Sequence, residues 1–409
     1  MGSVHGLENA LVKILMITKF LPVPADSGDK QRASAVLRRL GELGEVTICA
    51  FDDGTADHRA LERMGVGVRA LPMPQRIDFL LGMFKTRSIS SGRFWSRAFV
   101  RELRAAVVEL EPDCLVISYS QLAIHGSSLS ARYRLLDLHN IESSLFRSYA
   151  YSHKGPRALL AKFESRAIGR IERQALAVFD TVTVVSDKDR QRLERIKSGS
   201  KRPQVFVCPN GWDPSPPIPM GHDPAVVFIA LMGWAPNADG AVWLAEKVWP
   251  LVRADVPEAE LLLVGREPGP KVIALATDGI VVTGTVPDVA PYLARARVAV
   301  APLLSGGGSR LKILEALNSG RPVVATSIGA EALEQFEGEG LVIADDPRAF
   351  ADQIVGFLAD RESAENAGLR GNGSVAKHFS WEKTLGPLER AVSQIDKTRE
   401  RNIVTRRGK

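Results

Sequence analysis

The chain has 409 residues, of which 45% are hydrophobic and 24% charged, and its formal net charge is +6. These values are typical of a soluble globular enzyme, and the length exceeds one ordinary core, so two domains are expected. No segment approaches the roughly 20 consecutive apolar residues that span a membrane.

The start of the chain and its cysteines favour a cytoplasmic protein. Residues 1–10 lack the basic stretch followed by an apolar run that marks a secretory signal. Cys49, Cys114 and Cys208 are isolated from one another, each in or beside an apolar run. This pattern predicts reduced, buried thiols, and it has neither a disulfide framework nor metal-ligand spacing.

Positive charge is concentrated in the first half, where residues 1–212 carry a balance of +10 against −4 for residues 213–409. Residues 76–104 combine seven Lys or Arg and two acids with several aromatic and aliphatic residues. Such a segment either rests on an anionic membrane or lines an acceptor site, or it is an ordinary helix packing one face inward. We expect the ordinary helix and keep peripheral contact at the inner membrane face as the alternative. No nucleic-acid-binding module accompanies the charge, so no nucleic-acid partner is expected.

Short apolar runs alternate with helical patterns along the first half, which predicts a doubly wound α/β domain around a buried parallel sheet. The predicted strands are residues 11–18, 46–51, 114–118, 133–138, 181–185 and 205–207. The predicted helices are residues 30–43, 95–110 and 158–177.

Residues 209–219 are dense in proline and other turn formers and are expected to link two domains. The alternation then restarts, with predicted strands at 225–231, 260–264, 280–283, 298–301, 322–325 and 341–343. Helices are predicted at 238–252, 270–276, 309–318, 348–360 and 381–394. The sequence thus predicts two Rossmann-like domains facing each other across a cleft. The expected boundaries are a first domain at 1–212, a linker at 213–224, a second domain at 225–380, a helix at 381–396 packing back toward the first domain, and a basic tail at 397–409.

Residues 305–325 are the most informative segment, because three glycines precede an amphipathic helix that carries Arg310, Lys312 and Glu315. Glycines let backbone N–H groups approach an anion closely, and a helix start adds partial positive charge. The two bases would neutralise a diphosphate, and the carboxylate could accept hydrogen bonds from sugar hydroxyls. The segment therefore predicts a nucleotide-diphosphate ligand at the carboxyl edge of a parallel sheet.

This segment resembles the donor-site helix of GT-B glycosyltransferases and is most similar to the large retaining family numbered four. Residues 182–186 and 207–211 resemble that family's last first-domain strands and pre-linker turn, and residues 262–265 and 283–288 resemble a second-domain strand and the base-binding loop. These pieces cover most of the second domain and several points of the first. The resemblance implies that the first domain binds the acceptor and the second the donor.

The resemblance also implies a role for each matched residue. Glu315 matches the glutamate that binds ribose, and Gly28 lies in the glycine loop through which the first domain approaches the diphosphate. His139 follows a strand where the family often places a histidine beside the transferred sugar. The implied donor-binding residues are Gly28, Gly284, Thr285, Val286, Gly307, Gly308, Ser309 and Glu315. The implied catalytic residues are His139, Arg310 and Lys312.

The chain departs from the family pattern at two places. The family has a glutamate eight residues before Glu315, and here that residue is Gly307. The family also has an Arg and a Lys after the first strand of the second domain, whereas residues 233–239 contain no base. We infer that Arg310 and Lys312 take over neutralisation of the diphosphate.

The function expected from this resemblance is transfer of a sugar from a nucleotide diphosphate-sugar to an acceptor hydroxyl, with retention and without a metal. No further cofactor is implied. The Asp187 and Asp189 pair, which in another fold would suggest a metal, follows Ser186 at a helix start and is expected to cap it. Carbohydrate, lipid-linked and small natural-product acceptors all stay open. The alternatives are a nucleotide-sugar epimerase of the same fold and a non-catalytic nucleotide-sugar-binding subunit of a larger synthase. A dehydrogenase is disfavoured because no G-x-G-x-x-G motif follows the first strand.

Overall fold

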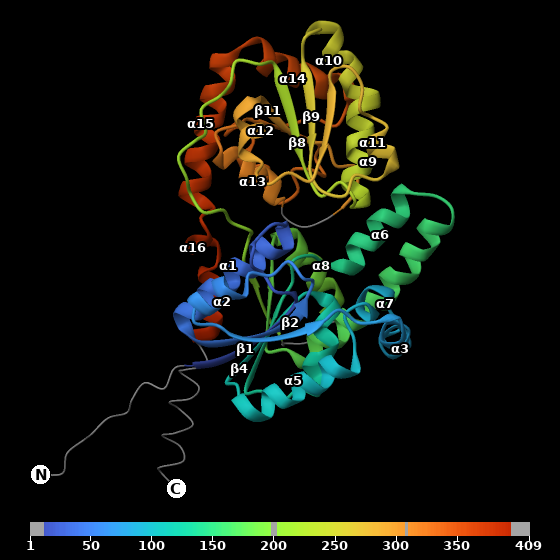
Figure 1. The fold of residues 1–409 in the computed structure, drawn as a ribbon, viewed down its shortest axis with the longest axis vertical. Helices are drawn as coiled ribbons and strands as arrows, with labels where there is room; N and C mark the ends of the chain where they lie inside the picture. Colours follow the sequence, from blue (N-terminus) through green and yellow to red (C-terminus); the bar gives the residue numbers. More distant parts are fainter. Residues whose placement is uncertain (1–11, 198–202, 307–309, 394–409) are drawn as a thin grey trace, which may run out of the picture. The chain divides into compact units, whose positions relative to one another are not determined.

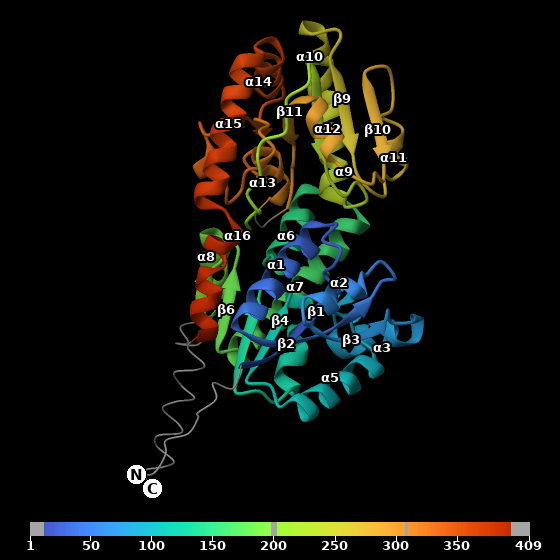
Figure 2. The same cartoon turned by 60° about the vertical axis from the view of Figure 1, so that its left-hand side comes forward.

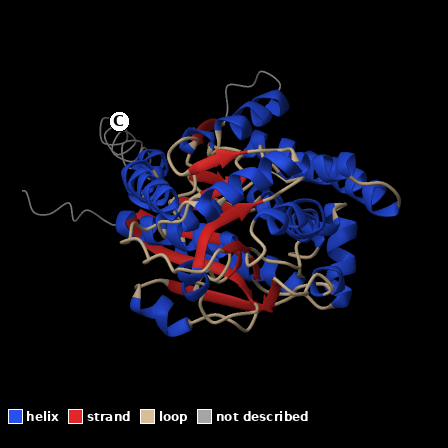
Figure 3. Ribbon diagram, turned by 90° about the horizontal axis from the view of Figure 1, so that it is seen from above, coloured by secondary structure: helices blue, strands red, loops and turns tan. Residues whose placement is uncertain are grey.

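The computed structural model describes residues 12–197, 203–306 and 310–393, and the chain divides into two compact units (Figure 1). The first unit comprises Met1–Phe146, Leu160–Cys208 and Leu385–Lys409. The second comprises Arg147–Leu159 and Pro209–Thr384. Each unit holds its own parallel sheet. Figure 3 shows the strands among the helices of the chain.

The first sheet has seven parallel strands in the order β3-β2-β1-β4-β5-β6-β7. This order reverses beside β1, and in sheets of this kind ligands bind beyond the carboxyl ends of the strands at that switch point. The strands are β1 Val12–Phe20, β2 Gly44–Asp52, β3 Gly67–Pro72, β4 Cys114–Ser118, β5 Tyr133–Asp137, β6 Thr181–Val184 and β7 Gln204–Val207. All of them except β3 are predicted by the apolar runs.

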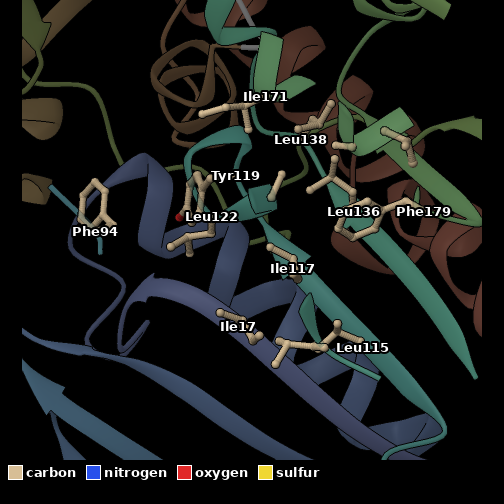
Figure 4. Packing of buried hydrophobic residues seen from close by; sticks show 14 of the residues in the cluster. Ile17, Phe94, Leu115, Ile117, Tyr119, Leu122, Leu136, Leu138, Ile171 and Phe179 are labelled. Carbon is tan, nitrogen blue, oxygen red and sulfur yellow. The ribbon is translucent and has the colours of Figure 1, made fainter. Parts of the chain in front are cut away.

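Helices pack on the first sheet around a buried apolar cluster (Figure 4). Ile17, Leu115, Ile117 and Leu136 of the strands lie in this cluster together with Phe179, which follows a long helix. The helical segments are α1 Gly28–Leu43, α2 His58–Arg63, α3 Arg76–Thr86, α4 Ile89–Gly92, α5 Arg97–Leu110, the 3-10 segment Ser120–Ser128, α6 Glu142–Ser152, α7 Pro156–Val178 and α8 Asp187–Lys197.

The basic segment at 76–104 forms three helices rather than one. The ordinary-helix interpretation is right for α5, which buries Phe99, Leu103 and Ala106. In α3 the fully buried residues are Gly82 and Thr86, whereas Ile77, Leu80 and Phe84 are exposed.

The second sheet has six parallel strands in the order β10-β9-β8-β11-β12-β13. Alternate strand residues face opposite layers: Val226 and Phe228 pack with α9, α10 and α14, whereas Val227 packs with α12, α13 and α15. Figure 2 shows α14 and α15 beside this sheet. The two layers explain the continuous apolar runs, since a strand buried on both faces needs no polar alternation. The strands are β8 Ala225–Ile229, β9 Glu260–Val264, β10 Ile280–Gly284, β11 Ala296–Ala301, β12 Val323–Ala325 and β13 Leu341–Ile343.

The helix predicted at 238–252 consists of three pieces: α9 Ala235–Trp243, a π-helical turn Leu244–Val248 and α10 Trp249–Asp255. Pro250 has no N–H to donate into the preceding turn, and the N–H of Trp249 bonds to the carbonyl of Leu244. The remaining helices are α11 Pro270–Ile273, α12 Ala290–Arg295, α13 Leu311–Asn318, the 3-10 turn Glu334–Phe336, α14 Pro347–Ala359, α15 Arg361–His378 and α16 Trp381–Thr384.

After α16 the chain returns to the first unit. Residues 386–393 are helical, and Glu389 forms an ion pair with Arg39 of α1. Within the described part of the chain, no helix is both long enough and apolar enough to cross a membrane. Together, the two parallel sheets and their helices confirm the expected pair of Rossmann-like domains.

Candidate active site

Two aromatic rings lie against each other at the carboxyl edge of the first sheet, tilted by 40°. Tyr119 follows β4 and His139 follows β5, and their ring centroids are 4.0 Å apart. The Tyr119 hydroxyl donates a 3.1 Å hydrogen bond to the carbonyl of Asp29, next to Gly28 at the start of α1. Tyr119 also has a φ of 77°, a conformation that costs a non-glycine residue energy and often marks a functional site. The predicted residues Gly28 and His139 are therefore joined through Tyr119.

His139 is buried and lies 3.2 Å, Nε2 to Oδ2, from Asp137. Burial lowers the pKa of His139 even though the carboxylate opposes this shift, so the imidazole is neutral at neutral pH. A neutral imidazole offers hydrogen-bonding groups to sugar hydroxyls.

Asp137 is also bound by Arg32. The guanidinium donates to both carboxylate oxygens, at 3.2 Å from Nε and 2.6 Å from Nη2, and the Thr183 hydroxyl donates at 2.6 Å. Burial alone would raise the pKa of Asp137, but the charge of Arg32 and the hydrogen bonds from His139 and Arg32 hold it well below its ordinary value. Asp137 thus positions the histidine and stays ionised.

Lys19 and two buried glutamates complete the polar group of the first unit, and sequence analysis missed their roles. The ammonium of Lys19, at the end of β1, lies 4.0 Å from the Tyr119 ring centroid and 3.9 Å from Oδ2 of Asp29. Burial raises the pKa of Glu142, an effect that the charge of Lys19 opposes. Glu172 accepts hydrogen bonds from the Ser120 hydroxyl and the Ser143 amide, and burial raises its pKa to about 7. Two features of the sequence could have pointed to these residues: Lys19 ends an apolar run, and Glu172 lies on the inner face of a predicted helix.

In the second unit, Lys312 projects from α13 toward the segment that follows β8. Its ammonium donates a 2.7 Å hydrogen bond to Oδ1 of the buried Asn237 and lies 4.8 Å from the ring centroid of Phe228. Burial and the charge of Arg310 lower the pKa of Lys312 to about 7, although Glu315 opposes this. An added anion here would restore the charged form.

Arg310 caps the start of α13 with its side chain buried. Nη2 donates to the carbonyl of Ile328 at 3.4 Å and packs against Gly306, where a Cβ would come within 2.8 Å of it. Gly306 has a φ of +129°, so both its backbone and its surroundings require glycine. The predicted residues Gly307, Gly308 and Ser309, which follow it, lie outside the described residues.

Glu315 lies one turn after Lys312 on α13 and is partly exposed. Burial raises its pKa to about 7, with Lys312 lowering it and Asp288 raising it further. Asp288 ends the predicted base-binding loop, in which Gly284 has a φ of +68°, Thr285 is exposed and Val286 packs on the apolar cluster beneath α13. The structure therefore brings this loop and Glu315 into one electrostatic neighbourhood.

The segment that lacks the expected bases is anchored by hydrogen bonds. Asn237 donates from Nδ2 to the carbonyl of Leu231 at 2.8 Å while accepting from Lys312. Asp239 lies 3.0 Å from Nε2 of His153, whose ring stacks on Tyr149.

Two other features of the molecule lie outside these groups. A hollow of about 520 Å³ opens beside β3, lined by residues that include Thr47, Arg69 and Glu102. At the start of α8 the Ser186 hydroxyl accepts from the amide of Asp189, and Asp187 and Asp189 lie in the first turn of the helix. Across residues 12–197, 203–306 and 310–393, no three His, Cys, Asp or Glu side chains form a group able to hold a metal ion.

Comparison with known proteins identifies two family matches, one in each half of the chain. Residues 28–211 match the family described as "Glycosyl transferase 4-like domain", and residues 223–360 match "Glycosyl transferases group 1".

Two curated proteins are similar in sequence. An uncharacterized 44.6 kDa protein in the cps region of Klebsiella pneumoniae is 24% identical over 92% of this chain and 99% of its own length. The lipopolysaccharide core biosynthesis mannosyltransferase LpsB of Rhizobium meliloti is 28% identical over a matched region of 179 residues. That region covers 40% of this chain and 50% of the length of LpsB.

Solved structures share the fold at low sequence identity. The sucrose-phosphate synthase of Thermosynechococcus elongatus has a TM-score of 0.67 and 18% identity, covering 96% of this chain and 100% of its own. HepE of Anabaena in complex with UDP-glucose has a TM-score of 0.61 and 15% identity, covering 95% of this chain and 99% of its own.

Proposed function

The chain belongs to the GT-B glycosyltransferases of group 1 and is an enzyme of that class, and we propose that it transfers a sugar from a nucleotide diphosphate-sugar to an acceptor hydroxyl, with retention at the anomeric carbon and without a divalent metal. The acceptor is a carbohydrate, a lipid-linked intermediate or a small natural product. HepE in complex with UDP-glucose makes UDP-hexoses the first donors to test.

One observation carries the proposal: Lys312 and Glu315 lie one turn apart on α13, with Arg310 at its start. Lys312 donates to a neutral amide, so its charge is available for a diphosphate that approaches the start of this helix. Glu315 lies near Asp288 of the base-binding loop, a position suited to accept hydrogen bonds from ribose hydroxyls. One short helix thus offers a positive charge for the diphosphate and a carboxylate for the ribose hydroxyls.

In the proposed reaction, the bond between the sugar C1 and the diphosphate oxygen breaks while C1 bonds to the acceptor oxygen on the same face. The proton of the acceptor hydroxyl passes to the leaving phosphate oxygen. Negative charge grows on the diphosphate as the bond breaks, and Arg310 and Lys312 stabilise it. Fixed charges aimed at developing charge are commonly the largest catalytic contribution.

We propose that the residues around Tyr119 in the first unit bind the transferred sugar. His139 is neutral and positioned by Asp137, so it orients a sugar hydroxyl by hydrogen bonding without titrating at neutral pH. Lys19 and Glu142 add a cation and a carboxyl group at the same sheet edge.

A panel of nucleotide sugars tests the assignment directly. The matching donor should raise the unfolding temperature by mass action, and turnover with an acceptor should give a product whose anomeric configuration is read by NMR. An inverted product contradicts the retaining mechanism. A change in donor configuration without any acceptor indicates an epimerase instead.

Gly307 gives a specific reason to keep a second candidate, a non-catalytic nucleotide-sugar-binding subunit. The carboxylate that the family pattern places there is missing, and with it a contact to the sugar. This candidate predicts donor binding without turnover until a partner protein is added.

We also propose that the chain works in the cytoplasm and contacts an anionic membrane peripherally. The concentration of positive charge in residues 1–212 supports the contact.

A further inference from the structure

Helix α3 is attached to the first unit through glycine rather than through its apolar side chains. A Cβ on Gly82 would come within 2.5 Å of the carbonyl oxygen of Gly92 in α4, so the two backbones are in close contact. Gly82 and Thr86 are the buried residues of α3. The large apolar residues of the helix are therefore free to face outward.

Three of them form one exposed stripe on α3. Ile77, Leu80 and Phe84 are spaced three and four residues apart, which places them on one face of the helix. Their exposures are 70%, 58% and 79%. A contiguous stripe of this kind on a soluble protein indicates a surface that binds an apolar partner.

Helix α7 adds a second exposed apolar patch and holds α3 in place. Leu160 and Phe163 are 53% and 54% exposed. Arg170 of α7 donates a 2.7 Å hydrogen bond to the carbonyl of Thr86 at the end of α3. Glu164 of α7 accepts from the amides of Ile89 and Ser90 at the start of α4, at 2.9 and 3.0 Å. These hydrogen bonds hold α3 and α4 to α7. Helices α3 and α7 are seen on the same side of the first unit in Figure 1.

The charges around these residues are almost entirely positive. The acids of α7, Glu164 and Glu172, are buried and used in hydrogen bonds, and the acid of α3, Asp78, is partly buried. Five exposed bases of α3, its C-cap and the 160–166 part of α7 form no ion pair with any residue in the described part of the chain. They are Arg76, Lys85, Arg87, Lys162 and Arg166.

We infer that this α3–α7 surface docks on an anionic membrane, with the apolar side chains at the boundary of the acyl chains and the bases among the phosphate head groups. The α3–α7 surface is defined by Ile77, Leu80, Phe84, Leu160 and Phe163 together with the five exposed bases. Exposed apolar residues flanked by unpaired cations are complementary to such a lipid surface, in which apolar burial and electrostatic attraction act together. The inference gives a location to the peripheral contact proposed above, and its test does not depend on sugar transfer.

Co-sedimentation of the full chain with vesicles tests the inference. One set contains phosphatidylcholine alone, and the other contains about one third phosphatidylglycerol, which supplies the negative charge. The wild type should bind the anionic vesicles, lose binding at high salt, and bind the neutral vesicles far more weakly.

Two surface variants separate the apolar and electrostatic contributions. Leu80→Ser with Phe84→Ser, and Lys85→Glu with Arg87→Glu, should each weaken binding to anionic vesicles at least about tenfold. All four side chains are exposed, so the fold should be retained, which unchanged unfolding temperatures would verify. The matched controls in the same unit are Val108→Ser, at a residue that is 78% exposed on α5, and Arg59→Glu with Arg63→Glu on α2, and these should bind like the wild type.

Equal binding by the surface variants and the controls overturns the inference, as does a wild type that ignores anionic vesicles. A dimer that Phe84→Ser dissociates, without any vesicle binding, assigns the surface to a second copy of the chain and also overturns it. Stabilisation by a nucleotide sugar is measured separately, so failure of membrane docking is distinguishable from failure of the proposed transfer.

Discussion

The ammonium of Lys312 donates a 2.7 Å hydrogen bond to Oδ1 of Asn237. This bond connects helix α13 with the segment at 233–239, where the family pattern has two bases and this chain has none. In the proposed function, Lys312 supplies from α13 the positive charge that the resemblance implies for the segment after β8.

Replacing Lys312 by methionine is expected to abolish most of the sugar transfer while preserving the fold. Methionine keeps the buried stem but removes the charge that stabilises the leaving diphosphate, so kcat should fall about 100-fold or more. Initial rates with the matching donor check this. Lys271→Met, at an exposed lysine of α11, is the matched control and should keep the wild-type rate. A Lys312→Met rate within a factor of two of wild type would remove Lys312 from the catalytic group.

The affinity for the donor should depend on pH through Lys312 and Glu315, both of which have pKa values of about 7. Diphosphate binding favours the protonated Lys312, so affinity falls as the pH rises above about 7. Ribose binding favours the ionised Glu315, so affinity also falls as the pH drops below about 7. A nucleotide sugar is the suitable ligand for the titration because its diphosphate is esterified at both ends and does not titrate in this range. Calorimetry from pH 5 to 9 should show a maximum near neutrality, and a flat profile contradicts the assignment.

The Glu315→Gln variant separates the two limbs of that profile. Glutamine still offers one carbonyl acceptor to the ribose but cannot ionise, so the acidic limb should disappear. Loss of the negative charge should also move the alkaline limb to lower pH, because Glu315 raises the pKa of Lys312. Retention of the acidic limb in this variant would assign it to another group.

The buried Arg32–Asp137 pair should contribute strongly to the stability of the first unit. Arg32→Leu leaves the Asp137 carboxylate buried without its cation, which typically costs about 3–5 kcal/mol. Asp137 has a folded pKa below its unfolded value, so its contribution is present above about pH 4 and is lost as the pH falls further. Urea unfolding should therefore show a wild-type advantage over Asp137→Asn that is constant from pH 8 to 5 and shrinks below about pH 4. An advantage that grows in acid contradicts this sign.

His139→Gln should lower the rate of transfer without changing donor affinity in proportion. In the proposed function the neutral imidazole orients a sugar hydroxyl, and loss of that hydrogen bond, about 1.4 kcal/mol, should lower kcat about tenfold. Because the pKa of His139 lies below its ordinary value, the alkaline limb of the pH profile should stay unchanged. His58→Gln, at an exposed histidine of the same unit, serves as the control. Wild-type kcat in His139→Gln would leave the histidine with a structural role.

The sequence allowed prediction of the two parallel sheets because most strands are buried on both faces and read as apolar runs. Strand β3 was not predicted because it lies at the sheet edge and is half exposed. Helix α15 was not predicted because three glycines interrupt its helical pattern of apolar residues. The site around α13 was visible because its bases and its glutamate are close in sequence. Tyr119, Lys19 and Glu172 were not, because only the topology of the sheet brings residues so far apart in the chain to one edge.

The most direct test of the donor site is calorimetric titration of nucleotide sugars into the wild type, Lys312→Met and Glu315→Ala, with Lys271→Met as the control. The wild type and the control should bind one donor with equal affinity, and each site variant should bind it at least about tenfold more weakly, the loss expected when a charged hydrogen-bonding partner is removed. Equal affinity in all four proteins, or no binding of any nucleotide sugar to the wild type, would contradict the assignment of Lys312 and Glu315 as the donor-binding pair.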